Sequence, residues 1–391
     1  MLNTSLSPWP SFTQEEADAV SKVLLSNKVN YWTGTECREF EKEFAAFAGT
    51  QYAVAVANGT LALDVALKAM GIGAGDDVIV TSRTFLASAS CIVNAGANPV
   101  FADVDLNSQN ISAETIKAAL TPNTKAVIVV HLAGMPAEMD DIMDLAKEHD
   151  LWVIEDCAQA HGAKYKGKSV GSIGHVGAWS FCQDKIMTTG GEGGMVTTND
   201  KELWSKMWSY KDHGKSYDAV YHREHAPGFR WLHESFGTNW RMMEMQAVIG
   251  RIQLKRMPEW TARRQAHAAK LAESLSKFAS IRLIEVADYI EHAQYKFYAF
   301  VKPEHLKDGW TRDRIVNELN ARKVPCYQGS CSEVYLEKAF DNTPWRPKER
   351  LKNAVELGDT SLMFLVHPTL TDGEIAFCKE HIEAVLAQAT A

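Results

Sequence analysis

The sequence predicts an α/β protein, with a mostly parallel central sheet flanked by helices and a smaller α+β region after it. Three observations lead to this prediction. From about residue 50 to 200, apolar β-branched runs alternate with helix-like segments, the runs are apolar on both faces, and the alternation stops after about residue 240. Strands that are apolar on both faces and separated by helices are typical of a parallel sheet buried between helix layers.

The first region contains strands and helices in strict alternation. Its predicted strands are 52–57, 77–82, 99–105, 125–132 and 151–156. The predicted helices between them are 60–73, 87–97, 112–120 and 139–150. Because parallel sheets bind ligands beyond the carboxyl ends of their strands, we expect the functional residues at that edge.

The second region begins with a long predicted helix over 242–278, which we expect to break near Pro258 because proline removes a helix hydrogen bond. A strand over 293–301 and helices over 311–323 and 372–389 follow. We therefore divide the chain into a large domain at 1–245 and a small C-terminal domain at 246–391.

Composition excludes several classes of protein. The 391 residues are 46% hydrophobic and 23% charged, as in ordinary globular proteins, and the net charge of -8 comes without a basic run that would bind nucleic acid. No apolar run approaches the ~20 residues of a membrane helix, and the first residues do not resemble a signal peptide. The seven cysteines are scattered without a CxxC pair, so we expect reduced thiols, a cytoplasmic protein and no metal site.

The first candidate site motif is ANGTLALDVAL (57–67), where a strand runs into Gly59 and Thr60 and then directly into a helix. Free backbone N–H groups at a helix start, together with a hydroxyl, suit a phosphate. The alternative is a plain helix cap. A P-loop is excluded because the GxxxxGK[ST] pattern is missing.

The second motif is VIEDCAQAHGA (153–163), where a buried strand ends in Glu155 and Asp156. These acids could simply cap the next helix. Alternatively, Asp156 is the buried partner of a protonated ring nitrogen, and Gln159 donates a hydrogen bond to a ring hydroxyl.

The third motif is SFCQDKIMTTGGEGG (180–194), which contains Lys185. A lone lysine is usually a solvated surface residue. Here Ser180 offers a hydroxyl for a phosphate, and the glycines at 190–194 let the backbone turn sharply and pass close to a ligand. The fourth motif, FGTNWRMMEMQA (236–247), places Asn239 at a domain junction, where the alternative is a helix-capping loop.

Together these residues match the needs of pyridoxal phosphate. Its aldehyde needs an amine, its ring nitrogen needs a carboxylate that keeps it protonated, and its phosphate needs a helix start and hydroxyls. Phe85, in SRTFLASAS after the second strand, can provide an aromatic plate for the ring.

The chain resembles the DegT-type family of sugar-nucleotide aminotransferases, which are fold-type I enzymes that use pyridoxal phosphate. The resemblance runs over nearly the whole length, from about 29–45 to 362–370. Its densest motifs are NGTLAL, VIEDCAQAHGA, SFCQDK, GGEGGMVTTND and GTNWRMMEMQA.

This resemblance implies a role for each candidate residue. Lys185 would hold the cofactor as a Schiff base, with Asp156 on the pyridinium and Gln159 on the ring hydroxyl. Phe85 would stack on the ring, and the phosphate would be held by Gly59, Thr60 and Ser180. Asn239 would reach the phosphate in the other subunit's site, so the resemblance also implies a homodimer with shared active sites.

The implied reaction moves an amino group from L-glutamate, through pyridoxamine phosphate, to C3 or C4 of a nucleotide-linked keto sugar. Some family members carry histidine at the Schiff-base position and remove a hydroxyl instead, so Lys185 favours transamination. The family's tyrosine–proline–histidine pattern near the sugar is replaced here by PCYQGSCSEVYLEKAF (325–340), without histidine. A dehydratase, an aminotransferase for a cyclitol or other small ketone, and a non-catalytic cofactor-binding regulator are the alternatives.

Overall fold

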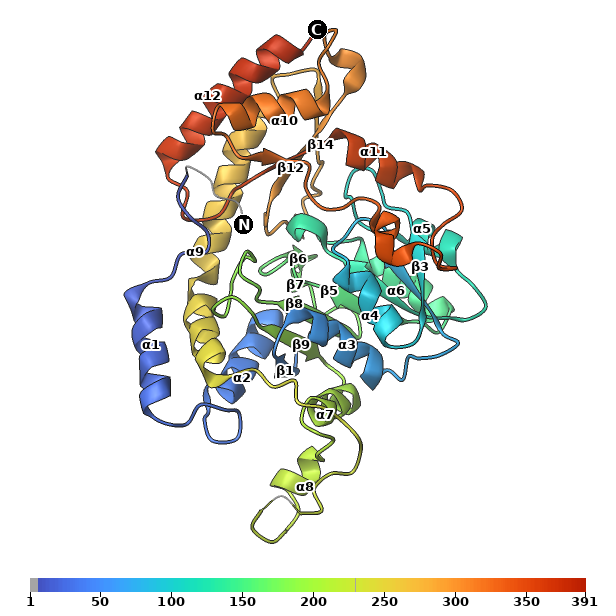
Figure 1. Ribbon diagram of the computed structural model, residues 1–391, viewed down its shortest axis with the longest axis vertical. Coiled ribbons are helices and arrows are strands. Elements are labelled where there is room, and N and C mark those ends of the chain that lie inside the picture. The colour runs from blue at the N-terminus through green and yellow to red at the C-terminus, as the bar shows by residue number, and fades with distance from the viewer. Residues whose placement is uncertain (1–5, 229) are drawn as a thin grey trace.

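The largest sheet has seven strands, in the order β1-β9-β8-β5-β4-β2-β3 (Figure 1). The structure, a computed structural model, describes residues 6–228 and 230–391. The strands are Tyr52–Val56 (β1), Asp77–Thr81 (β2), Asn98–Ala102 (β3), Thr124–Val130 (β4), Trp152–Asp156 (β5), Val176–Ser180 (β8) and Gly194–Thr198 (β9). Strand β9 is antiparallel to both neighbours, whereas the other pairs are parallel. The predicted mostly parallel sheet is therefore confirmed.

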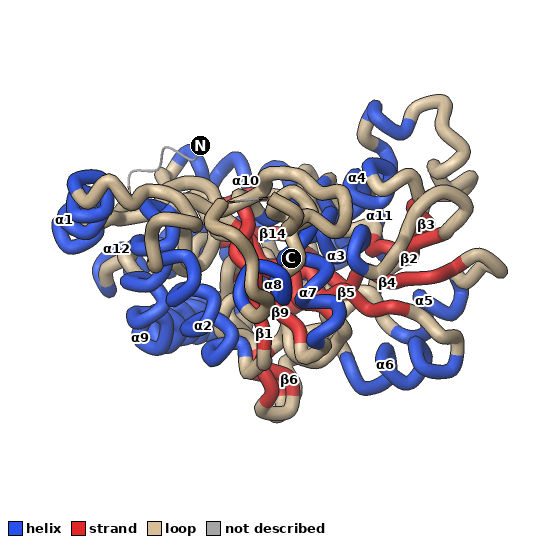
Figure 2. Tube along the Cα trace, turned by 90° about the horizontal axis from the view of Figure 1, so that it is seen from below, coloured by secondary structure: helices blue, strands red, loops and turns tan. Residues whose placement is uncertain are grey.

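Both faces of this sheet are buried, as the apolar strands predicted. Val78 and Val80 of β2 belong to one apolar cluster with residues of α3 and α4, and Ile79 belongs to a second cluster with residues of α5 and α6. Figure 2 shows α5 and α6 below strands β4 and β5, and α4 above them. The helices of the N-terminal part are Gln14–Leu25 (α1), Glu36–Ala48 (α2), Gly59–Ala69 (α3), Ala87–Asn94 (α4), Ala113–Ala119 (α5), Met139–Glu148 (α6), Lys201–Tyr210 (α7) and Tyr217–Tyr221 (α8).

A smaller antiparallel sheet, in the order β10-β12-β14-β13, lies in the C-terminal part of the chain. Its strands are Ile281–Leu283 (β10), Phe297–Val301 (β12), Cys326–Tyr327 (β13) and Ser361–Phe364 (β14), and its helices are Arg312–Ala321 (α10), Lys352–Thr360 (α11) and Asp372–Ala389 (α12). A third sheet joins Ile290–Glu291 (β11) to the hairpin Lys164–Tyr165 (β6) and Lys168–Ser169 (β7). The α+β character predicted for this part is confirmed.

Helix α9 runs without interruption from Glu244 to Leu275 (Figure 1), so the predicted break near Pro258 is wrong. Proline costs one backbone hydrogen bond, but α9 packs along α1, α2 and α12, and this packing holds the helix together. The predicted domain boundary at residue 245 lies at the start of α9 and stays a prediction. Among the described residues, no helix combines the length and apolar character that crossing a membrane requires.

Candidate active site

Lys185 lies in the connection between β8 and β9, where its backbone is held by the N-terminal segment. The Trp9 indole Nε1 donates a hydrogen bond to the Lys185 carbonyl oxygen at 2.8 Å. The lysine side chain is 17% exposed, and its Nζ lies 3.9 Å from Asp184 Oδ1 and 5.3 Å from the centroid of the Tyr295 ring. The Lys185 backbone is thus held in place, while its side chain stays partly exposed.

Asp156 is the last residue of β5, and its carboxylate is buried. Oδ2 accepts a hydrogen bond from Ser88 Oγ at 2.8 Å, and Oδ1 accepts one from the Ala158 N–H at 3.1 Å. Burial raises the pKa of Asp156, and these two hydrogen bonds and the charge of Lys185 only partly oppose it. A cationic partner would therefore stabilise this carboxylate.

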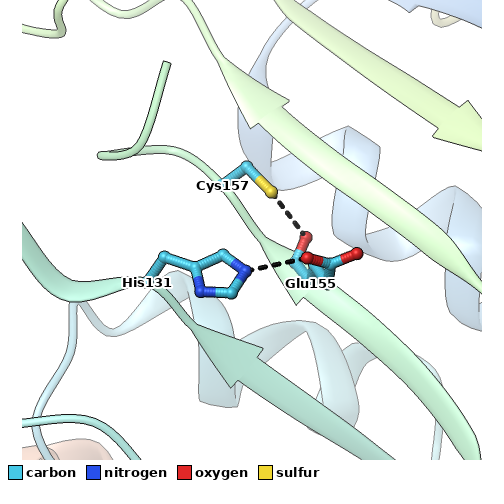
Figure 3. A group of neighbouring side chains, drawn as sticks. All are labelled: His131, Glu155 and Cys157. Atoms are coloured by element: carbon cyan, nitrogen blue, oxygen red, sulfur yellow. Dashed lines mark hydrogen bonds and ion pairs between the residues drawn. The ribbon is translucent and has the colours of Figure 1, made fainter. Parts of the chain in front are cut away.

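Glu155, one residue earlier, forms a different network with His131 and Cys157 (Figure 3). Its carboxylate accepts hydrogen bonds from His131 Nε2 at 2.9 Å and from the N–H groups of Gly171, Ile173 and Gly174. Burial alone would raise the pKa of Glu155, but the hydrogen bonds from His131 and the backbone outweigh it and lower the pKa. His131 Nδ1 also accepts from the Ala137 N–H, so the protein already uses the atoms that a metal would need.

The start of α3 and Ser180 form a small cradle. Asn58 caps the helix by accepting from the Leu61 N–H, and neither Gly59 nor Thr60 has a partner for its N–H among the described residues. A Cβ on Gly59 would lie 2.5 Å from Ser180 Cβ, so only glycine permits this approach. Asn58 thus caps the helix, and the backbone N–H groups of Gly59 and Thr60 remain available to bind an anion.

The glycines after Lys185 allow a sharp turn and close packing of the backbone. Gly190 and Gly191 have φ angles of 84° and 119°, which fits the predicted sharp turn. However, a Cβ on Gly193 would lie 2.0 Å from Thr189 Oγ1, and one on Gly194 would lie 2.3 Å from the Asn58 carbonyl oxygen. Gly193 and Gly194 therefore make room for the protein itself and bring β9 against the start of α3, and the expected approach of this run to a ligand stays a prediction.

Gln159 and Phe85 flank the same region. Gln159 is buried, and its Oε1 accepts from the Ala133 N–H at 2.8 Å, which leaves its amide nitrogen as a donor. Phe85 lies between β2 and α4, three residues before the Asp156 partner Ser88, and is 71% exposed. An exposed phenyl ring at the edge of a site is available to stack on a planar ligand.

Asn239 forms no hydrogen bond with the other candidate site residues in the described part of the chain. Its side chain is exposed, and its backbone pairs with Asp212. The next residue, Trp240, accepts a hydrogen bond from the Ala57 N–H at 2.9 Å, so the segment passes the end of β1.

Three residues beside Lys185 were missed from the sequence. Asp184 accepts a hydrogen bond from the Tyr295 hydroxyl, and Lys296 Nζ lies 4.7 Å from the Tyr295 ring centroid. Asp184 could have been found as the direct neighbour of Lys185. Tyr295 and Lys296 come from a segment whose pattern predicted only a strand.

The residues present fit pyridoxal phosphate. The free N–H groups of Gly59 and Thr60 and the Ser180 hydroxyl suit its phosphate, and buried Asp156 suits a protonated ring nitrogen. Lys185 supplies the amine for its aldehyde. These groups lie at the carboxyl ends of β5 and β8 and at the start of α3, where ligands of such sheets bind.

Comparisons with known proteins agree with this geometry. Residues 10–383 match the model of the DegT/DnrJ/EryC1/StrS aminotransferase family. The solved aminotransferase from Psychrobacter cryohalolentis is 65% identical, with a TM-score of 0.96, 98% of this chain covered and 99% of that one.

Two relatives extend the comparison. GDP-perosamine synthase from Caulobacter vibrioides is 41% identical over 86% of both chains. The dTDP-3-amino-3,4,6-trideoxy-alpha-D-glucose transaminase from Streptomyces venezuelae is 35% identical over 82% of this chain and 79% of its own. The resemblance predicted from the sequence is confirmed: the chain belongs to the DegT/DnrJ/EryC1/StrS aminotransferase family and is an aminotransferase that depends on pyridoxal phosphate.

Proposed function

We propose that this enzyme transfers an amino group from L-glutamate to C3 or C4 of a nucleotide-linked keto-deoxy sugar, in the biosynthesis of an amino sugar. The observation that carries the proposal is the Lys185 amine, held near buried Asp156 in a site that also contains the free helix start of α3. Relatives named for GDP-linked and dTDP-linked amino sugars support a nucleotide sugar as the acceptor.

The cofactor, when bound, supplies an aldehyde that takes up the amino group and a ring that withdraws electrons from the reacting carbon. Lys185 would hold it, and Asp156 would keep its ring nitrogen protonated. Gln159 would donate to the ring hydroxyl, Phe85 would cover one face, and Gly59, Thr60 and Ser180 would bind the phosphate.

Lys185 would also act as a general base in this proposal. Once its amine is released, Nζ can accept the proton from the α-carbon of the amino donor. Asp184 Oδ1, 3.9 Å from Nζ, then stabilises the resulting ammonium group. The Trp9–Lys185 hydrogen bond keeps the backbone in place while the side chain moves.

A homodimer with shared active sites completes the proposal. Asn239 is exposed and forms no hydrogen bond with Gly59, Thr60 or Ser180 among the described residues. Nearby, Trp231 is 92% exposed and Phe236 is 99% exposed, which is typical of residues that a second subunit covers. We place the enzyme in the cytoplasm, where its seven free cysteines would stay reduced.

The test is the absorption spectrum of the purified, cofactor-loaded protein before and after L-glutamate. We expect the visible band of the lysine-bound cofactor to disappear as the amino form accumulates. An unchanged band would contradict the donor assignment, and no band after incubation with pyridoxal phosphate would contradict the whole proposal. A panel of keto sugars and cyclitols then identifies the acceptor. If the enzyme turned over only a cyclitol, the assignment of a nucleotide sugar as the acceptor would be wrong.

A further inference from the structure

Three cationic side chains gather around Tyr295, next to the candidate active site. The Nζ atoms of Lys185 and Lys296 lie 5.3 Å and 4.7 Å from the ring centroid, and Arg264 Nη1 donates to the Tyr295 carbonyl oxygen at 3.3 Å. Asp184, which accepts from the Tyr295 hydroxyl, contributes a negative charge. The cluster therefore carries three positive charges and one negative charge.

Two of these cations, Lys296 and Arg264, have no ionic partner among the described residues. Within residues 6–228 and 230–391, no carboxylate oxygen lies within 4.0 Å of Lys296 Nζ or of the Arg264 guanidinium. Arg264 is 1% exposed, packs on the Trp9 ring at 5.0 Å, and leaves Nε and Nη2 without a hydrogen bond in the described chain.

The surroundings penalise both charges. Burial, together with the charges of Arg264 and Lys185, lowers the pKa of Lys296 to about 8, although the charge of Asp184 acts in the opposite direction. Burial likewise lowers the pKa of Arg264 to about 9. Arg264 is buried and Lys296 is partly buried, and an unpaired cation with little access to water is destabilised, so a bound anion would stabilise this cluster.

The position of the cluster narrows the choice of anion. The cofactor phosphate is accounted for at the start of α3 and Ser180. The diphosphate of a nucleotide sugar is bulky and is attached at a sugar carbon remote from the one that receives the amine. The carboxylate of an amino acid, in contrast, is bonded to the carbon that bears the reacting amine, and this amine takes the place of Lys185 Nζ.

We propose that Lys296, supported by Arg264, binds the α-carboxylate of the amino donor. This inference rests on the proposed function and adds the subsite that selects an amino acid as donor. The Tyr295 hydroxyl donates to Asp184 Oδ2, and Asp184 Oδ1 lies 3.9 Å from Lys185 Nζ, so both oxygens of the one carboxylate of the cluster already have a partner.

The experiment measures binding of glutarate, an unreactive dicarboxylate, to the cofactor-loaded enzyme by titration calorimetry. Losing a charge-assisted hydrogen bond should weaken glutarate binding by roughly 10- to 100-fold in Lys296→Met. Lys296→Arg, which keeps the charge, should restore most of the affinity. Lys338→Met removes an exposed lysine outside the cluster and should bind glutarate like the parent enzyme.

Equal glutarate affinity in the parent enzyme and in Lys296→Met would overturn the inference, as would a parent enzyme that binds no glutarate. Inorganic pyrophosphate is the second probe. We expect its affinity to be unchanged in Lys296→Met, and a selective loss of pyrophosphate binding would assign the cations to the diphosphate of the acceptor instead.

Spectra with L-glutamate separate this inference from the proposed function. Lys296→Met should need more L-glutamate for half-conversion than the parent enzyme and should reach the same end point. A parent enzyme that L-glutamate does not convert would contradict the proposed function. Conversion with the same concentration dependence in both proteins would overturn the carboxylate site alone.

Discussion

Strand β5 ends in two neighbouring buried carboxylates, and their surroundings differ. Glu155 accepts hydrogen bonds from His131 and from three backbone N–H groups, and its pKa is lowered. Asp156 accepts from Ser88 and from the Ala158 N–H, and its pKa is raised. The protein satisfies the first carboxylate by itself and leaves the second in need of a partner. The comparison teaches that the supply of hydrogen-bond donors, more than burial, decides whether the protein alone stabilises a buried carboxylate.

The largest expected effect is on the rate of amino transfer, and it follows from replacing Lys185, whose charge acts on Asp156. Lys185→Arg keeps a positive charge but removes the amine that can bind the cofactor and move a proton, so amino transfer should fall by about 10⁴-fold or more. Turnover with L-glutamate and a keto sugar measures this loss. An unchanged melting temperature is the control, and normal turnover would disprove the assignment of Lys185.

The next test removes the charge of Asp156. In Asp156→Asn the ring nitrogen loses its anionic partner, so the rate should fall by about 10²–10³-fold. Since burial penalises the ionised form of Asp156, the protein without cofactor should be as stable as the parent or more stable. Paired kinetic and urea-unfolding measurements test both halves, and a destabilised cofactor-free variant would make Asp156 a structural residue like Glu155.

The matching change on the other acid is Glu155→Gln. The amide cannot accept all of the hydrogen bonds from His131 and the backbone, so the free energy of unfolding should decrease by about 3 kcal/mol. The rate per folded molecule should stay close to the parent value. Urea unfolding and titration of active sites measure these quantities, and a stable variant with lost activity would reverse the comparison.

The smallest effect is the pH dependence of stability. The lowered pKa of Glu155 means that its contribution is present above the unfolded-state value and is lost as pH falls through the folded pKa. The raised pKa of Asp156 acts in the opposite direction and relieves a penalty as pH falls. Unfolding of the parent protein and Glu155→Gln across the acidic range should therefore converge, and a constant difference between them would contradict this account.

Much of the fold and part of the site were accessible from the sequence because they depend on local patterns. The strands at the centre of the large sheet were predicted from runs of residues that are apolar on both faces, such as Val78 to Val80. The motifs around Gly59, Asp156 and Lys185 predicted that polar residues lie at the ends of strands. The proposed roles of these residues stay predictions.

The remaining features depend on contacts between distant segments. Nothing near Lys296 in the sequence shows that it lies in one cluster with Lys185 and Arg264, since these residues come from different elements. The fate of Pro258 was likewise decided by the helices packed against α9. Local spacing also gave no sign that Gly194 faces the Asn58 carbonyl.

The N-terminal segment links the C-terminal part of the chain to Lys185. Ser7 donates from its N–H and hydroxyl to the Glu374 carboxylate of α12, and the Pro8 carbonyl accepts from Thr369 Oγ1. Trp9 then donates to the Lys185 carbonyl. Residues 7–9 thus connect the C-terminal helix to the backbone of Lys185. If α12 rotates against the large sheet, the Lys185 carbonyl must move with it, or the hydrogen bond from the Trp9 indole must break. A movement of the C-terminal helix is therefore coupled to the backbone position of Lys185.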